Sequence, residues 1–184
     1  MRAPNGAAVG ATVTAPQPLT LGDEMPLGTL GACVGLQPSD VVVRHHQPRW
    51  ASTGNDYVIA EVTGAALSRA APDVASFRRA AERLAVRGRL SVYLYARADR
   101  AVRARMFAPL AGTFEDPATG SAAAPLAGLL LSLDRVDDTR FDIVQGVEMG
   151  RPSRLHVTAR RDARGIMTTV GGSCVPVMEG ELTL

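Results

Sequence analysis

Apolar and polar residues alternate along many short segments of this chain, which is the pattern of half-buried β-strands. In the first part of the chain this alternation predicts strands at 9–15, 40–46, 57–63, 90–96 and 101–107. In the last third it predicts strands at about 140–145, 154–160, 166–170 and 174–183. Short turns that contain glycine separate neighbouring strands, and this spacing favours an antiparallel or mixed sheet.

Three other segments are expected to be helical. The clearest amphipathic helix is expected at 73–87, where Asp73 can cap the N-terminus and Gly88 ends the helix. A short helix near 27–35 is expected to close at Gly35. Two stretches rich in turn-forming residues are expected to be irregular loops. They cover residues 49–56 and 108–120.

The third helix, expected at about 121–133, is apolar around most of its circumference. Its apolar residues include Ala122, Ala123, Leu126, Leu129, Leu130 and Leu133. A helix of this kind is buried on every side. A buried central helix among so many strands suggests a sheet wrapped around it. The sequence therefore predicts an α+β domain with a barrel-like, mixed or antiparallel sheet.

The composition fits one domain with a hydrophobic core. The chain has 184 residues, of which 46% are hydrophobic and only 4% aromatic, so Leu, Val and Ala must fill the core. We expect residues 1–10 to form an N-terminal tail and residues 11–184 to form the domain. No window approaches about 18 consecutive apolar residues, and the N-terminus has no signal-peptide core. The chain is therefore expected to be cytoplasmic, with no membrane span.

The basic residues exclude several kinds of chemistry. All 20 are arginine, so a lysine Schiff base and a P-loop lysine are impossible. The net charge is only +2, and the one basic cluster contains Arg97, Arg100, Arg103 and Arg105. We interpret this cluster as a solvated face. Nucleic-acid binding would need a broad basic surface with aromatic or groove-reading partners, which the sequence does not offer.

The cysteines and histidines do not indicate a metal site or a disulfide. Cys33 lies in an apolar stretch and is expected to be buried and inert, and nothing marks the chain as secreted. His45 and His46 are adjacent, so in an extended segment their rings point to opposite faces and cannot share a metal. His156 alternates with apolar neighbours and is expected on the solvent side of a strand. We expect no metal and no organic cofactor.

The strongest chemical signal lies between Arg105 and Ser121, where a strand ends, an acidic loop follows and a Gly-Ser pair opens the apolar helix. Helix N-termini present unpaired N–H groups and a partial positive charge. Gly120 permits close approach and Ser121 adds a hydroxyl, so the pair can seat a carboxylate. Asp116 can hold an ammonium or hydroxyl of the same ligand. The alternative is an ordinary helix start, with Ser121 as the cap and Asp116 in a turn.

Several motifs together resemble the phenazine-biosynthesis (PhzF-like) isomerases, which belong to the diaminopimelate epimerase fold group. They are R-x-FAP at 105–109, EDPATGSA at 115–122, QGVEMGRPS at 145–153, VGG at 170–172 and GELTL at the end. The Ser-Thr-Gly turn at 52–54 is similar to a turn in the second domain of that family. Gly54 and Asn55 are similar to the diaminopimelate epimerase turn that contacts the substrate. The resemblance extends from about residue 11 to the end.

The resemblance implies a specific fold and activity. Members of the family have two similar domains, each a sheet around a central helix, that face each other across the substrate cleft. They isomerise a dihydro-hydroxyanthranilate by moving a proton, without a metal or organic cofactor. By motif, Asp116 would be catalytic and contact a polar group of the substrate, and Gly120 and Ser121 would bind the small carboxylate. Thr119, Gly54 and Asn55 are further binding candidates. Thr119 stands where true epimerases have a cysteine, which argues against a two-thiol mechanism.

Half of the family's active site has no counterpart in this sequence. The general base of the family is a first-domain glutamate, accompanied by a Gly-His-Ala-Thr segment, and neither is present. The nearby carboxylates Glu115, Asp56 and Glu148 do not match that base by motif. The chain therefore resembles a C-terminal domain whose N-terminal domain is missing.

Three interpretations of the missing half remain open. The first half can be absent from this chain or come from another polypeptide. Two copies can also pair, because the fold is an internal duplication and a homodimer imitates the two-domain cleft. Otherwise the chain is a non-catalytic module that binds a small carboxylate or a protein partner. Because an isolated half would expose apolar surface, we expect a dimer or larger assembly.

Overall fold

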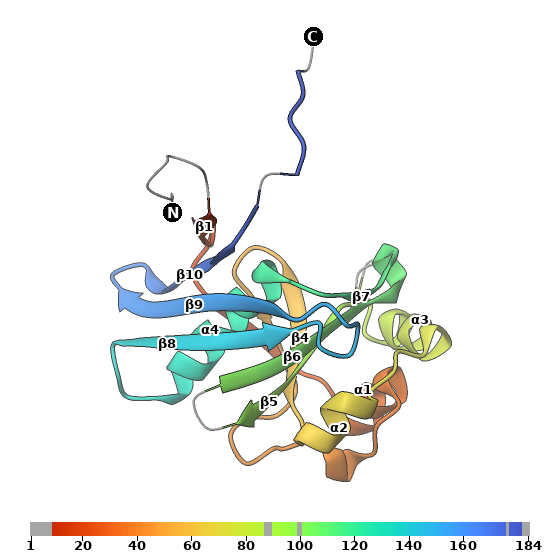
Figure 1. The fold of residues 1–184 in the computed structure, drawn as a ribbon. Coiled ribbons are helices and arrows are strands. Elements are labelled where there is room, and N and C mark those ends of the chain that lie inside the picture. The colour runs from red at the N-terminus through yellow and green to blue at the C-terminus, as the bar shows by residue number, and fades with distance from the viewer. Residues whose placement is uncertain (1–8, 87–89, 99–100, 176, 182–184) are drawn as a thin grey trace.

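The computed structural model describes residues 9–86, 90–98, 101–175 and 177–181. Their strands form one ten-stranded mixed sheet (Figure 1). In sheet order the strands are β1 (Gly10–Thr14), β10 (Gly165–Ser173), β9 (Ser153–Asp162), β8 (Asp138–Gln145), β6 (Ala101–Ala108), β5 (Val92–Ala98), β4 (Asp56–Glu61), β3 (Arg49–Ser52) and β2 (Thr20–Glu24). The tenth strand, β7 (Thr113–Asp116), pairs with β6. The pairs β4–β5 and β6–β8 are parallel and the others antiparallel, which confirms the predicted mixed sheet.

Two hydrophobic cores lie on opposite faces of the curled sheet. One core contains α4 (Gly120–Leu133), and the other contains α1 (Leu27–Val34), α2 (Gly64–Arg69) and α3 (Val74–Arg83), which gather on one side in Figure 1. The strand β5 contributes to both cores, since its odd-numbered and even-numbered residues face opposite sides. Tyr93 and Tyr95 face α4, whereas Val92 and Leu94 face the other helices. This arrangement explains the continuous apolar run of β5.

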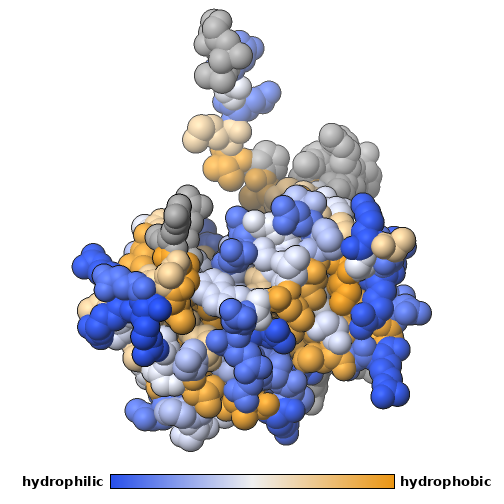
Figure 2. All heavy atoms as spheres, turned by 180° about the vertical axis from the view of Figure 1, so that it is seen from behind, coloured by the Kyte–Doolittle hydropathy of each residue, from blue (hydrophilic) through white to orange (hydrophobic). Residues whose placement is uncertain are grey.

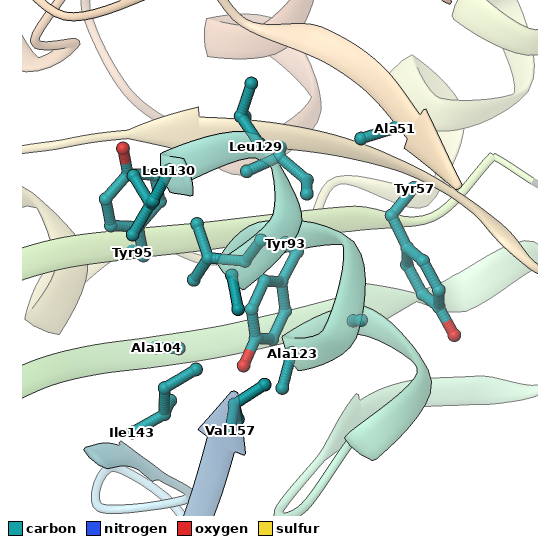
Figure 3. Packing of buried hydrophobic residues seen from close by; sticks show 14 of the residues in the cluster. Ala51, Tyr57, Tyr93, Tyr95, Ala104, Ala123, Leu129, Leu130, Ile143 and Val157 are labelled. Carbon is teal, nitrogen blue, oxygen red and sulfur yellow. The ribbon is translucent and has the colours of Figure 1, made fainter. Parts of the chain in front are cut away.

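The helix α4 packs against the strands on its face of the sheet. All residues from 122 to 131 are buried, and α4 contacts β10, β9, β8, β4 and β3. Figure 3 shows how Ala123, Leu129 and Leu130 of α4 lie among side chains from these strands and from β5. Gly128 lies tightly against Leu19, since a Cβ atom at position 128 would lie 3.2 Å from Leu19 Cδ1. The apolar character of this segment therefore follows from its packing.

The ends of the predicted helices follow the expected capping rules. Gly35 closes α1 in the left-handed conformation with φ of 67°, as expected for a C-terminal glycine. The Asp73 side chain accepts a hydrogen bond of 2.6 Å from the Ser76 amide and so caps α3. The helix α3 ends at Arg83, earlier than the predicted 87, and the predicted stop at Gly88 lies outside the described residues.

Several predicted elements are wrong because local patterns do not reveal long-range pairing. The expected strand 40–46 is absent from the structure; Val41 forms only an isolated bridge with Val62, after a single 3-10 turn. The strands β3 and β7 lie inside the two expected loops, and the exposed edge strand β2 has no apolar alternation to predict it. The helix α2 was not predicted from the sequence. The described residues between 174 and 181 contain no strand, contrary to the expected strand at 174–183.

The membrane and cysteine expectations can be compared directly with the structure. No helix in the described part of the chain is both long and apolar enough to cross a membrane. Cys33 is buried on α1, and burial raises the pKa of its thiol to about 11, which confirms that it is buried and accords with an inert thiol. His156 lies on β9 with 41% of its side chain exposed, which confirms its predicted place on the solvent side.

Candidate functional site

Two hollows open beside the N-terminus of α4. The first has a volume of about 470 Å³, and none of its lining residues is charged. The second has a volume of about 670 Å³ and is lined by Asp116 and Thr119, among others. Gly54, Asn55 and Ser121 line both hollows. A small molecule can therefore reach the first turn of α4 from two sides.

The strand pair β6–β7 carries Asp116 to the rim of the second hollow. Met106 pairs with Asp116 and Ala108 pairs with Thr113 across the two strands. Between them Gly112 turns the chain with φ of 82°, a left-handed conformation that favours glycine. As a result the half-buried Asp116 lies immediately before the start of α4.

Arg105 fastens this strand pair to the rest of the domain. Its Nε and Nη2 groups donate hydrogen bonds of 2.8 Å to the two carboxylate oxygens of Glu115. Its Nη1 group donates to the carbonyl oxygens of Leu67 and Ala70 at the end of α2, at 2.9 and 2.7 Å. Carbonyl groups at a helix C-terminus lack helical partners, so the guanidinium satisfies them. The predicted solvated face is therefore wrong for Arg105, whose side chain is only 8% exposed.

The other arginines of the predicted cluster have separate roles. Arg103 forms an ion pair with Glu148, and Arg97 lies with its Nε 3.6 Å from a carboxylate oxygen of Glu61. Arg100 lies outside the described residues. Arg103 and Arg105 lie two apart on β6 and share a face, but Arg103 is the more exposed, at 37% of its side chain against 8% for Arg105.

Two of the three nominated carboxylates are engaged in ion pairs. Glu115 is bound by Arg105 and Glu148 by Arg103. Asp56 lines the second hollow and is exposed. Neither glutamate lines either hollow, and a general base must reach the proton it removes. The geometry therefore gives no support to Glu115 or Glu148 as the base.

Thr119 occupies the N-cap position of α4, but its hydroxyl does not cap the helix. The hydroxyl instead donates a 2.7 Å hydrogen bond to Oδ2 of Asp116. Among the described residues, the amide groups of Gly120 and Ser121 have no hydrogen-bond partner. The alternative reading of Ser121 as the cap is therefore wrong. The first turn of α4 retains free N–H donors and the positive end of the helix dipole.

Tyr57 is a site residue that the sequence reasoning missed. Its hydroxyl lies 2.7 Å from Oγ of Ser121, and it lines the second hollow together with Asp116 and Thr119. Tyr57 is buried on β4 and faces α4, as the alternation of that strand requires. When Tyr57 donates to Ser121, the serine proton is free to point into the hollow. The alternation of β4 was a signal for this position.

Gly54 and Asn55 lie on the turn between β3 and β4, opposite the start of α4. Gly54 has φ of 139°, and a Cβ atom there would lie 2.8 Å from Cγ of Pro16, so only glycine fits. Asn55 is exposed to both hollows. The structure thus brings all six predicted site residues together around one helix terminus, namely Asp116, Thr119, Gly120, Ser121, Gly54 and Asn55. Their roles stay predictions.

A second polar cluster lies at the other end of β4. His45 Nδ1 is 2.6 Å from Oε2 of Glu61, and His46 Nε2 is 2.8 Å from the hydroxyl of Tyr95. The prediction that the two rings point to opposite faces is wrong, because the segment is not a strand and both rings meet this cluster. Within the described residues, no group of three or more His, Cys, Asp or Glu side chains is placed to hold a metal.

Fold and site together define an α+β domain with a curled mixed sheet and two hollows beside the N-terminus of one buried helix. Residues 13–180 match the PhzC-PhzF family, described as phenazine biosynthesis-like protein, and the chain belongs to this family. An uncharacterized isomerase of Mesorhizobium japonicum is 34% identical over 175 residues, covering 91% of this chain and 57% of that protein. The trans-2,3-dihydro-3-hydroxyanthranilate isomerase of Pseudomonas chlororaphis is 34% identical over 190 residues, covering 98% of this chain and 61% of that protein.

Solved structures support the same fold. A PhzF-family phenazine biosynthesis protein of Bacillus anthracis superposes with a TM-score of 0.81 at 21% identity, covering 100% of this chain and 64% of that one. A predicted epimerase of Pseudomonas aeruginosa superposes with a TM-score of 0.68 at 29% identity, covering 94% of this chain and 57% of that one. The chain therefore spans about three fifths of the length of these relatives.

Proposed function

We propose that this chain is the substrate-anchoring half of a PhzF-like isomerase. The reaction would move a proton on a small amino-acid-like carboxylate, without a metal or organic cofactor. The isomerase names of the relatives support this reaction class. The curled sheet and the buried helix α4 support placing residues 11–184 as one domain in the diaminopimelate epimerase fold group.

The pairing of opposite charges around the start of α4 carries the proposal. The free amides of Gly120 and Ser121 would receive the substrate carboxylate, and the serine hydroxyl would donate to it. Asp116 lines the second hollow together with Ser121 and would accept from the substrate's ammonium or hydroxyl group. Hydrogen bonds to charged groups contribute roughly 1.5–3 kcal/mol each, so two opposed anchors fix both position and orientation. Thr119, Gly54 and Asn55 would complete the binding surface.

The other half of the cleft must supply the general base. It would come from a further part of the same polypeptide, from another polypeptide or from a second copy of this chain. Apolar side chains support a missing neighbour: Val175, Val177 and Met178 are 78%, 87% and 92% exposed on the C-terminal stretch that projects from the body (Figure 1). On the face in Figure 2, apolar residues also reach the surface between hydrophilic patches. Exposed patches of this kind usually mark interfaces.

Light scattering over a range of concentrations tests the homodimer form of this proposal. We expect the solution mass of a dimer or a larger assembly. A clean monomer across the micromolar range would contradict the homodimer and leave a partner domain as the source of the base.

Deuterium exchange tests the reaction. Trans-2,3-dihydro-3-hydroxyanthranilate, incubated with the assembled dimer in D2O, should gain deuterium, and Asp116→Asn should reduce this rate about 10- to 100-fold, because the substrate loses a charged hydrogen bond worth roughly 1.5–3 kcal/mol. Asp142→Asn is the matched control, because Asp142 pairs with His156 on the strands β8 and β9, outside both hollows. Equal rates in wild type and Asp116→Asn would overturn the role of Asp116.

A binding module for a small carboxylate is the second candidate function. The ion pairs of Glu115 and Glu148 favour it, because they leave the described residues with only Asp56 of the three nominated bases outside an ion pair. A wild-type chain that binds the compound and never exchanges its proton, even as a dimer, would support this second function.

A further inference from the structure

Gln145 is a completely buried amide at the end of β8, directly behind the candidate site. Its side chain has no exposed area, and β8 brings it against the loop from Asp116 to Thr119. Burying an amide without partners costs about 1–3 kcal/mol by protein mutational data, so a buried glutamine is expected to have its hydrogen bonds satisfied.

Every hydrogen-bonding position of the Gln145 amide is used. The Nε2 group donates to the carbonyl oxygen of Asp116 at 2.6 Å and to Oγ1 of Thr119 at 2.9 Å. The Oε1 atom accepts from the hydroxyl of Tyr93 at 3.0 Å and from the amide of Thr119 at 3.3 Å. An amide has two donors and two acceptor sites, so this arrangement fixes the orientation of the group.

The amide also fixes the direction of the next hydrogen bond. Because Oγ1 of Thr119 accepts from Gln145, its own proton is free to donate to Oδ2 of Asp116. The other oxygen, Oδ1, has only a 3.5 Å contact with the amide of Ala118. The oxygen Oδ2 of Asp116 is thus fixed by the hydrogen bond from Thr119, while Oδ1 stays available to a ligand in the hollow.

The glycine after Gln145 permits this close approach. Gly146 has φ of 81°, and a Cβ atom there would lie 2.8 Å from the carbonyl oxygen of Pro117 and 2.5 Å from that of Arg151. Any other residue would push the end of β8 away from the Asp116 loop. The Gln-Gly pair therefore acts as one unit, in which glycine allows the contact and glutamine makes it.

We propose that Gln145 is a positioning residue, which orients the Asp116 carboxylate through the hydroxyl of Thr119 and does not itself touch the substrate. The inference rests on the proposed function, in which Asp116 receives the ligand. A glutamine at the end of β8 therefore has a physical reason, and Thr119 belongs to the same relay.

A double-mutant cycle separates positioning from a merely structural role. Thr119→Val removes the hydroxyl while keeping the shape, and Thr119→Ser keeps the hydroxyl as the matched control. We expect Thr119→Val to weaken binding of trans-2,3-dihydro-3-hydroxyanthranilate about tenfold, the effect of one hydrogen bond to a charged group, and Thr119→Ser to stay within about twofold. In an Asp116→Asn background the further effect of Thr119→Val should fall below about twofold. A tenfold effect in both backgrounds would overturn the inference.

A measurement without ligand keeps the inference testable if the proposed function fails. In ¹³C and ¹⁵N spectra, Thr119→Val should change the chemical shift of the Asp116 carboxyl carbon. Thr119→Ser should leave that chemical shift close to its wild-type value. The Gln145 side-chain amide protons should exchange with water more slowly than those of the exposed Gln17. An unchanged Asp116 carboxyl resonance in Thr119→Val would contradict the relay whether or not any ligand binds. Absent ligand binding together with the predicted resonance changes would refute the proposed function alone.

Discussion

Tyr93 and Tyr95 lie two residues apart on β5, face the same core, and differ in what their hydroxyls contact. Both side chains are fully buried, and burial raises the pKa of each phenol above its usual range. Figure 3 shows the two hydroxyl groups pointing in opposite directions. The hydroxyl of Tyr93 donates to Gln145, whereas that of Tyr95 lies between His46 and Glu61.

The two networks differ in whether each hydrogen-bond proton has one possible acceptor or two. Around Gln145 every proton has one possible position, because an amide does not titrate. Around Tyr95 one hydroxyl proton faces two acceptors, Nε2 of a neutral His46 at 2.8 Å and Oε2 of Glu61 at 3.1 Å. Nδ1 of His46 must donate to the carbonyl of Gln47 at 2.7 Å, which leaves only Nε2 to change.

The domain thus keeps a polar network built on the Gln145 amide, which does not titrate, apart from the one that contains His46 and Glu61. The amide network lies behind the candidate site, where the Gln145 amide orients the Thr119 hydroxyl toward Asp116. The titratable network lies at the far end of β4 and β5. Protonation of His46 would reverse the Tyr95 hydrogen bond toward Glu61, so pH should act on stability through this end and leave the site geometry unchanged.

Removing the amide should give the largest effect. Gln145→Leu leaves the carbonyl of Asp116, the amide of Thr119 and the hydroxyl of Tyr93 without their partner, and we expect a loss of about 2–4 kcal/mol in the free energy of unfolding. The loss should be the same at pH 6 and pH 8. Gln17→Leu, at an exposed position, should stay within about 0.5 kcal/mol in the same urea titration. A loss below 1 kcal/mol for Gln145→Leu would contradict the network.

A pH series should reveal the titratable network. Burial is the main cause that lowers the pKa of His46 below its usual 6.5, in a setting that includes Glu61, Arg97 and Arg49. The unfolded chain then binds a proton at this histidine before the folded one does. Stability is therefore complete above about pH 6.5 and falls as the pH drops, by up to about 1.4 kcal/mol per pH unit.

Two variants identify the source of that slope. His46→Gln should flatten the dependence between pH 5 and 6.5, measured by urea unfolding at each pH. Tyr93→Phe is the control and should keep the wild-type slope, because its network contains no group that titrates in this window. If His46→Gln kept the wild-type dependence of stability on pH, a group other than His46 would cause that dependence.

The smallest expected effect is the difference in unfolding free energy between the variants that remove the Tyr93 and the Tyr95 hydroxyl. Tyr93→Phe should cost about 1 kcal/mol, because Oε1 of Gln145 keeps its bond from the Thr119 amide. Tyr95→Phe should cost about 1–2 kcal/mol at pH 8, because Nε2 of His46 loses its donor. Thermal unfolding at pH 8 resolves this difference; a larger loss for Tyr93→Phe would reverse the comparison.

The sequence predicted the parts of the fold that depend on local pattern. The apolar period of α4 and the alternation of β5, β6 and β9 are visible in short windows. The segment from Asp116 to Ser121 was also recognisable, because helix starts have a local chemistry. These parts place most of the candidate site residues around one helix terminus.

The rest depends on contacts between distant residues. The Tyr57 hydroxyl meets Ser121, which is 64 positions away, and Gln145 reaches Thr119 across 26 positions. The burial of Arg105 follows from the end of α2, a helix of six residues with too short a pattern to predict. Exposed edge strands such as β2 have no apolar face, so their sequence shows no alternation that predicts a strand. In each case the missing information was a neighbour in space.

In the proposed function, a substrate carboxylate binds the first turn of α4. The most direct test is a titration of the ¹⁵N-labelled protein with trans-2,3-dihydro-3-hydroxyanthranilate, followed through the amide resonances. We predict that the Gly120 and Ser121 amides shift downfield most and saturate together, and that Asp116→Asn weakens the binding. Saturable shifts confined to residues outside both hollows, or no shift of these two amides at millimolar ligand, would contradict the account.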